Sequence, residues 1–302
     1  MKTGGWAVGA ALLLSSAPLI AADEDAPVVL EPTSPWNVHY ADDYCRLARV
    51  FGAGASRVTL VIDKFGPGDG FNLTLAGPRM KFRQSNGVAK IRFGTEFPEQ
   101  QLSFHSGSLG EGGPAWVFAP GVDIRPLPIA TAPAGSIRTV GDVIAATAPP
   151  TDAEKASVTT VDIGSPLSHP VRLQTGSMEL AFAAMDRCLD ELMAHWGIDV
   201  ARHKTMSRPT IPQGHPGLWV TFLDYPEDML RNNMAGIVHL RLTIDEKGRP
   251  TACHVQQSTD RGGFNKRVCA MLMRRARFKP ALDRDGKPMV SYFRSSVRFE
   301  TY

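Results

Sequence analysis

Short strands dominate the pattern of apolar and polar positions in the first two thirds of the chain. Runs rich in β-branched and aromatic residues, bounded by Gly, Pro or polar positions, are typical of strands. Such runs lie at residues 57–62, 69–75, 89–93, 102–105, 115–118 and 157–163. At residues 178–196 apolar positions recur with helical spacing, and Gly197 follows as a stop. The pattern predicts, over residues 23–200, a β-rich domain with a sandwich or barrel-like architecture closed by one helix.

The last part of the chain, residues 217–302, has a different and clearer pattern. Val238, Leu240, Leu242 and Ile244 alternate with polar residues, which predicts a half-buried strand. A tight turn ending at Gly248 then leads into a partner strand, so the two strands form a hairpin. Further elements are predicted as a short helix at 228–233, a helix at 264–277 and a last strand at 290–299. The order is α-β-β-α-β, which predicts a small domain of helices and strands and an α+β fold for the whole chain.

The two predicted domains differ in charge and are separated by a Pro-containing segment. Residues 201–216 hold three prolines among polar residues and are predicted to form a semi-stiff, extended linker. From residue 217 onward there are 15 Lys and Arg against 9 Asp and Glu, a net charge of +6, whereas the whole chain carries only +3. The total is too small to indicate nucleic acid as a partner.

The first 22 residues have the pattern of an export signal. Lys2 is the only charge before Asp23, residues 6–14 are apolar, Pro18 interrupts the run, and Ala21 and Ala22 offer a cleavage site. A spanning helix needs about 20 predominantly apolar residues. We therefore expect residues 1–22 to be a cleaved signal peptide and the mature protein to be periplasmic. An uncleaved inner-membrane anchor is the alternative.

Four cysteines in an exported chain favour two disulfides. They lie at positions 45, 188, 253 and 269, and three pairings are possible. The pairs Cys45–Cys188 and Cys253–Cys269 keep each bond within one predicted domain. Buried free thiols are the alternative.

The C-terminal part resembles the C-terminal domain of TonB, the bacterial energy transducer for outer-membrane transport. The resemblance rests on Tyr225-Pro226, on Gly236-Ile237-Val238 at the start of the first strand, and on Lys247-Gly248 in the turn. Further matches are Val255-Gln256-Gln257-Ser258, Phe264-Asn265, the run Arg275-Ala276-Arg277-Phe278-Lys279-Pro280-Ala281, Gly286-Lys287-Pro288 and the ending Val297-Arg298-Phe299. The rest of the chain resembles no family that we recognise.

The resemblance implies a three-stranded antiparallel sheet with the helices packed on it. It also implies that the last strand is a free edge, which accepts an extended receptor segment, the TonB box, as an added strand. It implies the partner-binding residues Tyr225, Pro226, Tyr292, Arg294, Ser296 and Arg298, and an outer-membrane receptor or envelope protein as the partner. A dimer through the exposed last strand is a further possibility. Two alternatives stay open: Tyr225-Pro226 as simple helix initiation, and Arg294 and Arg298 as charges that protect a sheet edge.

Three functions are consistent with these features. The first is an exported TonB-like protein that binds a partner peptide in TonB-dependent transmembrane transport. The second is an anchored energy transducer, although the folded first domain and short linker differ from the long Pro-rich spacer of such proteins. The third is an enzyme in the β-rich domain, which we do not expect. The eight histidines show no metal-binding spacing, and the chain has no nucleophile-elbow, P-loop or dinucleotide-binding motif. The Gly-rich residues 65–70 are interpreted as a hairpin turn, and no cofactor is expected.

Overall fold

The first unit is a single, strongly curled sheet. The computed structural model describes residue 1 and residues 26–68, 70–118, 120–126, 150–259 and 263–300. The sheet has ten strands in the order β1-β10-β9-β6-β7-β8-β5-β4-β3-β2. All neighbours pair antiparallel except β1 and β10. The strands are β1 (Val28–Leu30), β2 (Asn37–Tyr40), β3 (Cys45–Phe51), β4 (Val58–Lys64), β5 (Asn72–Ala76), β6 (Asn86–Phe93), β7 (Gln100–Ser108), β8 (Pro114–Phe118), β9 (Thr160–Ile163) and β10 (Val171–Gln174).

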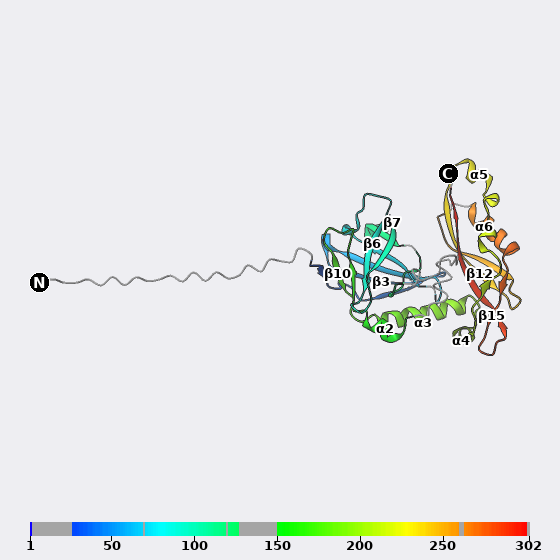
Figure 1. Ribbon diagram of the computed structural model, residues 1–302, viewed down its shortest axis with the longest axis horizontal. Helices are drawn as coiled ribbons and strands as arrows, with labels where there is room; N and C mark the ends of the chain where they lie inside the picture. Colours follow the sequence, from blue (N-terminus) through cyan, green and yellow to red (C-terminus); the bar gives the residue numbers. More distant parts are fainter. Residues whose placement is uncertain (2–25, 69, 119, 127–149, 260–262, 301–302) are drawn as a thin grey trace, which may run out of the picture.

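One long helix closes this sheet, as the sequence predicts. α3 (Glu179–His195) buries Phe182, Met185, Cys188 and Leu189 against the apolar side of the sheet, and the short α2 (Asp152–Ser157) packs beside it. The Cys45–Cys188 disulfide ties β3 to α3. Figure 1 shows α3 running below the first unit toward the second. A β-rich domain closed by one helix is therefore present, and its sheet is curled rather than split into two layers.

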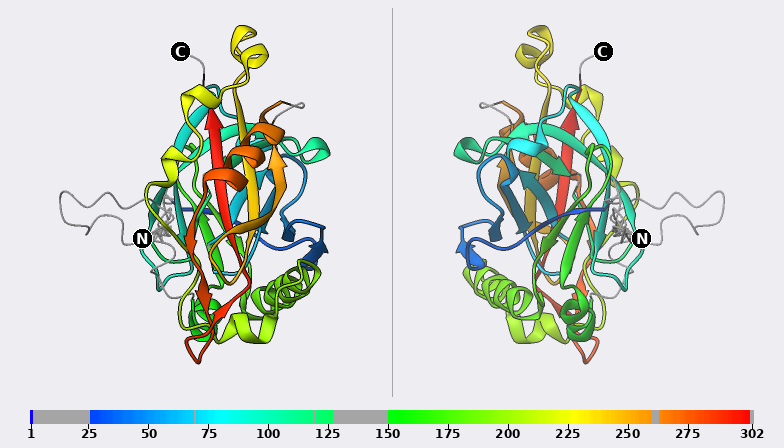
Figure 2. Two further views of the ribbon diagram at one scale, coloured as in Figure 1. Left: turned by 90° about the vertical axis from the view of Figure 1, so that its right-hand side faces the viewer. Right: turned by 90° about the vertical axis from the view of Figure 1, so that its left-hand side faces the viewer.

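The second unit is a three-stranded antiparallel sheet in the order β13-β12-β17, with α6 on one face. In Figure 2, α6 lies in front of the gold and red strands of this sheet. Its elements are α5 (Glu227–Arg231), β12 (Gly236–Ile244), β13 (Pro250–Ser258), α6 (Phe264–Arg275) and β17 (Ser291–Phe299), with the two-residue strands β14 (Phe278–Lys279), β15 (Ala281–Leu282) and β16 (Pro288–Met289) before β17. The predicted order α-β-β-α-β is confirmed. The Cys253–Cys269 disulfide joins β13 to α6.

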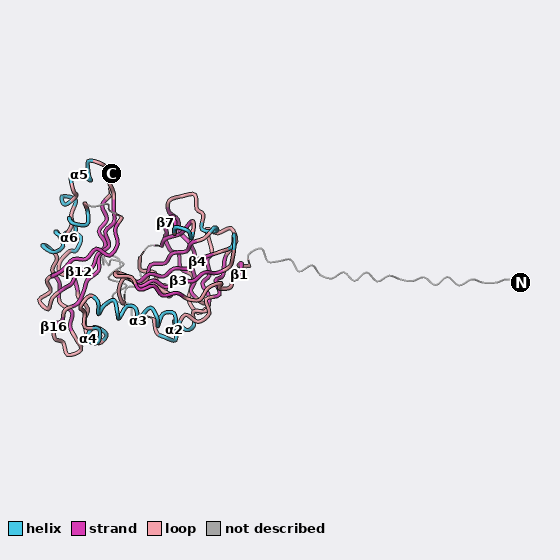
Figure 3. The backbone as a smooth tube through the Cα atoms, turned by 180° about the vertical axis from the view of Figure 1, so that it is seen from behind, coloured by secondary structure: helices cyan, strands magenta, loops and turns pink. Residues whose placement is uncertain are grey.

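Each unit has its own apolar core. Val238, Leu240, Leu242 and Ile244 are all nearly inaccessible to solvent and pack under α6 with Phe264. The core of the first unit is made of residues between Leu30 and Leu192. Two cores joined by a short connection explain the two bodies seen from behind in Figure 3.

The connection between the units is not the extended linker that we predict for residues 201–216. Asp199 caps a helix, α4 (Val200–Lys204), by accepting a hydrogen bond from the Arg202 amide. The chain then lies along the second unit, where β11 (Ile211–Pro212) pairs with β14 and the Ser207 amide donates to the Leu282 carbonyl. The prolines and polar residues of this segment predicted a free spacer. In the structure, backbone pairing with the second unit holds the segment in place.

The predicted signal segment, residues 1–22, lies outside the described residues apart from Met1. Within the described part of the chain, no helix has both the length and the apolar content needed to cross a membrane.

A candidate partner-binding edge

β17 is an edge strand of the second sheet. It pairs with β12 along its whole length, from Gly236 opposite Phe299 to Ile244 opposite Ser291. Among the described residues, no further strand continues the sheet beyond it. An edge of nine residues is long enough to accept another strand.

The direction of the backbone groups follows from the bonds of β12. The Ile237 carbonyl accepts from the Thr259 amide at 3.1 Å, and the Ile237 amide donates to the Thr259 side chain at 2.9 Å, so Ile237 faces the β13 side. Arg298 lies opposite Ile237, so this is a non-hydrogen-bonded pair of the β12–β17 ladder. The backbone groups of Arg298, and by alternation those of Ser296, Arg294 and Tyr292, consequently point out of the sheet. These are the four β17 residues that the resemblance implies as partner contacts.

The side chains of β17 separate into two faces. Phe293, Val297 and Phe299 pack toward the helix side and join the apolar core of the second unit. Tyr292 and Arg294 point the other way, toward the first unit, where the Tyr292 hydroxyl donates to the Pro67 carbonyl at 3.1 Å. The Arg294 guanidinium lies 5.5 Å from the centre of the Phe65 ring. This division agrees with the alternation expected for a strand.

A chain segment runs beside β17 on its helix side. The Trp219 ring lies 6.3 Å from the Phe293 ring, and the Tyr225 ring lies 5.2 Å from the Phe299 ring, so residues 219–225 follow the strand. Both views of Figure 2 place this part of the chain next to β17, on the side away from β12. No backbone hydrogen bond joins the segment to β17 within the described residues. The edge therefore has a neighbour but no pairing strand.

Tyr225 and Pro226 have structural roles in this arrangement. The Tyr225 side chain is 7% exposed, its hydroxyl donates to the Met234 carbonyl at 2.5 Å, and burial raises its pKa. Pro226 caps α5, and its carbonyl accepts from the Leu230 amide. The structure brings Tyr225 to one end of β17 through Phe299, whereas Pro226 belongs to the start of α5. Helix initiation fits the contacts of Pro226.

A buried carboxylate holds the segment in place. Asp224 is 2% exposed and accepts two hydrogen bonds from Arg275 on α6, at 2.5 and 3.0 Å. It also accepts from the Thr221 amide and hydroxyl. The Arg275 bonds are the main cause that lowers the pKa of Asp224 to about 2. This pair was not predicted, because no sequence pattern links Asp224 to a helix that begins 40 residues later.

The first unit covers the face of the second sheet that is opposite α6. The Gln256 side chain donates to the carbonyls of Asp43 and Phe65, and the His254 Nε2 atom lies 2.6 Å from Asp43. The Arg241 guanidinium lies 4.1 Å from the centre of the Trp196 ring, at the end of α3. A cavity of about 330 Å³ lies here, lined by residues of both units. The alternation of polar and apolar residues predicted that one side of this hairpin faces solvent. In the structure, the first unit covers that side.

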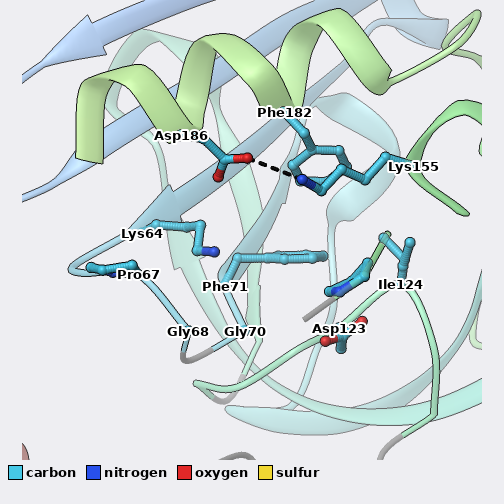
Figure 4. A pocket seen from close by; sticks show the side chains of 11 residues that line it. Lys64, Pro67, Gly68, Gly70, Phe71, Asp123, Ile124, Lys155, Phe182 and Asp186 are labelled. Atoms are coloured by element: carbon cyan, nitrogen blue, oxygen red, sulfur yellow. Dashed lines mark hydrogen bonds and ion pairs between the residues drawn. The ribbon is translucent and has the colours of Figure 1, made fainter. Parts of the chain in front are cut away.

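The first unit also has a small cavity of its own, about 240 Å³ in volume. Figure 4 shows Phe71 and Phe182 in its interior, and Lys155 paired with Asp186 at 3.0 Å. Typical pockets for organic ligands have volumes of about 300–1,000 Å³. The volume of this cavity is below that range. The charged side chains that line it are both acidic and basic.

Comparison with known proteins agrees with the resemblance in the second unit. Residues 222–301 match the family model described as the C-terminal domain of the Gram-negative bacterial TonB protein. A search of curated proteins finds no match for the chain. The second unit is therefore a TonB C-terminal-like domain, and the family match does not extend to the first unit.

Proposed function

We propose that this protein is an envelope protein of the periplasm that binds an extended segment of a partner protein along β17, in TonB-dependent transmembrane transport. The observation that carries the proposal is the edge itself. Four alternate residues of β17 direct their backbone donors and acceptors out of a sheet that matches the TonB C-terminal family. A partner segment would extend the sheet by one strand, with backbone bonds supplying affinity.

The proposed role is binding, without a catalytic step. Its partner is an outer-membrane receptor or another envelope protein, since that is the partner the TonB resemblance implies. The contacts of the second unit support a rigid platform: Asp224, the Cys253–Cys269 disulfide and the first unit hold the sheet from several sides. A preformed edge costs little ordering entropy on binding.

The test is titration of the full mature chain with synthetic eight-residue TonB-box peptides, followed by amide hydrogen exchange and chemical shifts. We expect protection of the outward amides of Tyr292, Arg294, Ser296 and Arg298. Ser296→Pro removes one outward donor and should weaken binding at least tenfold. Ser296→Ala keeps the donor and is the matched control. Shifts restricted to the first unit, or equal binding by both variants, would contradict the added strand.

Ser295→Pro distinguishes the two sides of the strand. Ser295 lies opposite Leu240, so its amide points into the sheet. Proline at this position should lower the free energy of unfolding of the second unit, whereas Ser296→Pro should leave it nearly unchanged. Thermal unfolding of the two variants measures the difference.

The state of the N-terminus decides between an exported and an anchored protein. Mass spectrometry of protein purified from the native envelope should show a chain that begins near Asp23 in the soluble periplasmic fraction. Intact Met1 in washed inner membranes would favour the anchored transducer instead.

A further inference from the structure

The cavity between the two units contains a buried positive charge. Arg241 lies on β12, lines this cavity and is 7% exposed. Within the described residues its guanidinium has one hydrogen bond, which Nη1 donates to the Thr243 hydroxyl at 3.5 Å, and no carboxylate lies at ion-pair distance. A separation of 3.5 Å is longer than the 2.9–3.0 Å that is usual for such bonds. The Nε atom of Arg241 is buried and has no hydrogen-bond partner in the described part of the chain.

A buried guanidinium without a carboxylate beside it is unusual. Charged side chains are almost never fully buried unless they are paired. The Trp196 ring, whose centre lies 4.1 Å from the guanidinium, supplies a cation–π contact but accepts no conventional hydrogen bond. Burial lowers the pKa of Arg241, and the charge of Asp43 raises it. Arginine binds carboxylates through two parallel N–H donors, so the donors that Arg241 leaves unused suit the carboxylate of a ligand.

The first unit contributes acidic groups to the same cavity. Asp42 and Asp43 lie between β2 and β3, and both line the cavity. Asp43 lies 2.6 Å from the Nε2 atom of His254, which is opposite Arg241 on the neighbouring strand. Asp42 is exposed and forms no ion pair with another described residue. The cavity therefore has a cation from one unit and carboxylates from the other, so a ligand of a single charge sign would meet repulsion from one of them.

The size of the cavity suits a small organic molecule. Its volume is about 330 Å³, at the lower end of the range of about 300–1,000 Å³ for ligand pockets. A water molecule occupies about 30 Å³ in the liquid, so the cavity has room for a molecule of several carbon atoms. The Trp196 ring and Ala252 supply apolar surface beside the charged groups.

We propose that this cavity binds a small zwitterion, an α-amino acid, with its carboxylate on the Arg241 guanidinium and its ammonium group toward Asp42 and Asp43. The ligand would contact both units, so its binding would hold them together. The site lies on the covered face of the second sheet and not at the β17 edge, so it is independent of the added strand of the proposed function.

The first test is thermal unfolding of the full mature chain with each of the common L-amino acids, added one at a time at millimolar concentration. A ligand that binds only the folded chain raises the unfolding temperature. We expect such a rise with at least one amino acid, and hydrogen exchange should then show protection on both sides of the cavity, at residues 41–44 and 252–254. No rise with any of them would mean that water fills the cavity and would overturn the proposal, as would protection restricted to other regions.

Two analogues of the best ligand test the zwitterion. One is the carboxylic acid that lacks the ammonium group, and the other is the amine that lacks the carboxylate. Calorimetric titration should show that each binds at least tenfold more weakly, because each loses one of the two charged contacts. An acid that binds as tightly as the amino acid would overturn the role of the aspartates, and an equally tight amine would overturn that of Arg241.

Arg241→Met tests the carboxylate end of the site. Met is apolar and nearly as long, and replacing a buried charge by an apolar side chain is often neutral or stabilising, so the fold should be retained. Amino-acid binding should fall at least tenfold, whereas Arg284→Met, the matched control, should leave it unchanged because Arg284 is 76% exposed in a turn. Unfolding without ligand verifies that both variants are folded. Unchanged affinity in Arg241→Met would refute the site.

Asp42→Asn tests the ammonium end and keeps the shape of the side chain. We expect about fivefold weaker binding of the amino acid, the factor that one exposed ion pair can contribute, and no change for the carboxylic acid analogue. Equal losses for both ligands would contradict the proposed orientation. Titration of the same variants with TonB-box peptides reports separately on the β17 edge, so the failure of one proposal is distinguishable from the failure of the other.

Discussion

Asp224 is the residue whose loss should affect the second unit most. The side chain is buried, and its removal leaves the Arg275 guanidinium without its carboxylate partner. Breaking a buried ion pair costs about 3–5 kcal/mol, so we expect Asp224→Ala to lower the free energy of unfolding by about that amount. Urea denaturation measures it. Asp285→Ala is the control, because Asp285 is 66% exposed and has its ion-pair partner Arg284 at 3.7 Å. Equal losses in both variants would refute a special role for Asp224.

The same carboxylate predicts a pH dependence. The pKa of Asp224 is about 2 in the folded protein, against 3.8 for the unperturbed group. Because folding lowers this pKa, the stabilisation is fully present above about pH 4 and is lost as the pH falls through about 2. Unfolding measured between pH 2 and 5 should show a decline that is smaller in Asp224→Ala, where Asp162 and Asp283, whose pKa values are also lowered, still contribute.

Two glycines at equivalent turn positions allow a second matched test. Gly248 and Gly286 both end an Asp-x-x-Gly turn, with φ angles of 76° and 77°. A Cβ atom at Gly248 would lie 1.9 Å from the Phe278 carbonyl oxygen, whereas at Gly286 it would meet nothing within 4 Å. Gly286→Ala should therefore cost about 1 kcal/mol from its backbone conformation, and Gly248→Ala should cost about 3 kcal/mol or more from conformation and collision. Thermal unfolding of the two variants compares them directly, and a similar loss in both would show that the turn relaxes.

At the scale of elements, the disulfides should differ in their effect. Cys45 and Cys188 are 143 residues apart, and Cys253 and Cys269 are 16 apart. In the loop-entropy model the longer bond contributes about 5 kcal/mol and the shorter about 3 kcal/mol. Replacing each pair by Ala should destabilise only its own unit, as hydrogen exchange followed by mass spectrometry would show. Peptide mapping without reductant provides the check on pairing, and links between the units would contradict it.

Elements with a strong local pattern could be predicted from the sequence, and those defined by distant contacts could not. The β12–β13 hairpin and α6 have clear apolar periodicity and a turn glycine, and they lie close to the predicted ranges. By contrast, β2 has the sequence Asn-Val-His-Tyr and is mostly exposed, so it lacks the apolar signal of a strand. It is ordered by pairing with β3 at the sheet edge.

The same limit applies to the candidate edge. The alternation of side chains along β17 puts Phe293, Val297 and Phe299 on one face, and all three belong to the core of the second unit. It could not reveal that Tyr292 contacts Pro67, because the two residues are 225 positions apart in the chain. Alternation alone could also not show which residues lie opposite the two histidines of the hairpin. His239 lies opposite Gln257, and after a register shift His254 lies opposite Arg241.

At the scale of the whole molecule, Trp196 is one of the residues that join the two units. Its ring contacts Arg241 and Tyr292 of the second unit, from the end of α3 in the first. Trp196→Ala removes the surface on which the buried Arg241 rests, and we expect the units to separate part of the time. Small-angle scattering should then give a larger radius of gyration, while Trp196→Phe should retain the compact form. An unchanged radius for Trp196→Ala would mean that the polar contacts of Gln256 and His254 suffice.

The nine-pair ladder between β12 and β17 also has a mechanical consequence. A segment bound beside β17 and pulled along its own length would load every hydrogen bond of its ladder at once, in shear. If the same segment were pulled perpendicular to the strand, its hydrogen bonds would break one after another. Because β12 lies between β17 and the disulfide-linked β13, a lengthwise pull would pass into covalently braced structure. If a segment binds there, the edge would resist force along the strand and would release the segment more readily when the force is perpendicular to it.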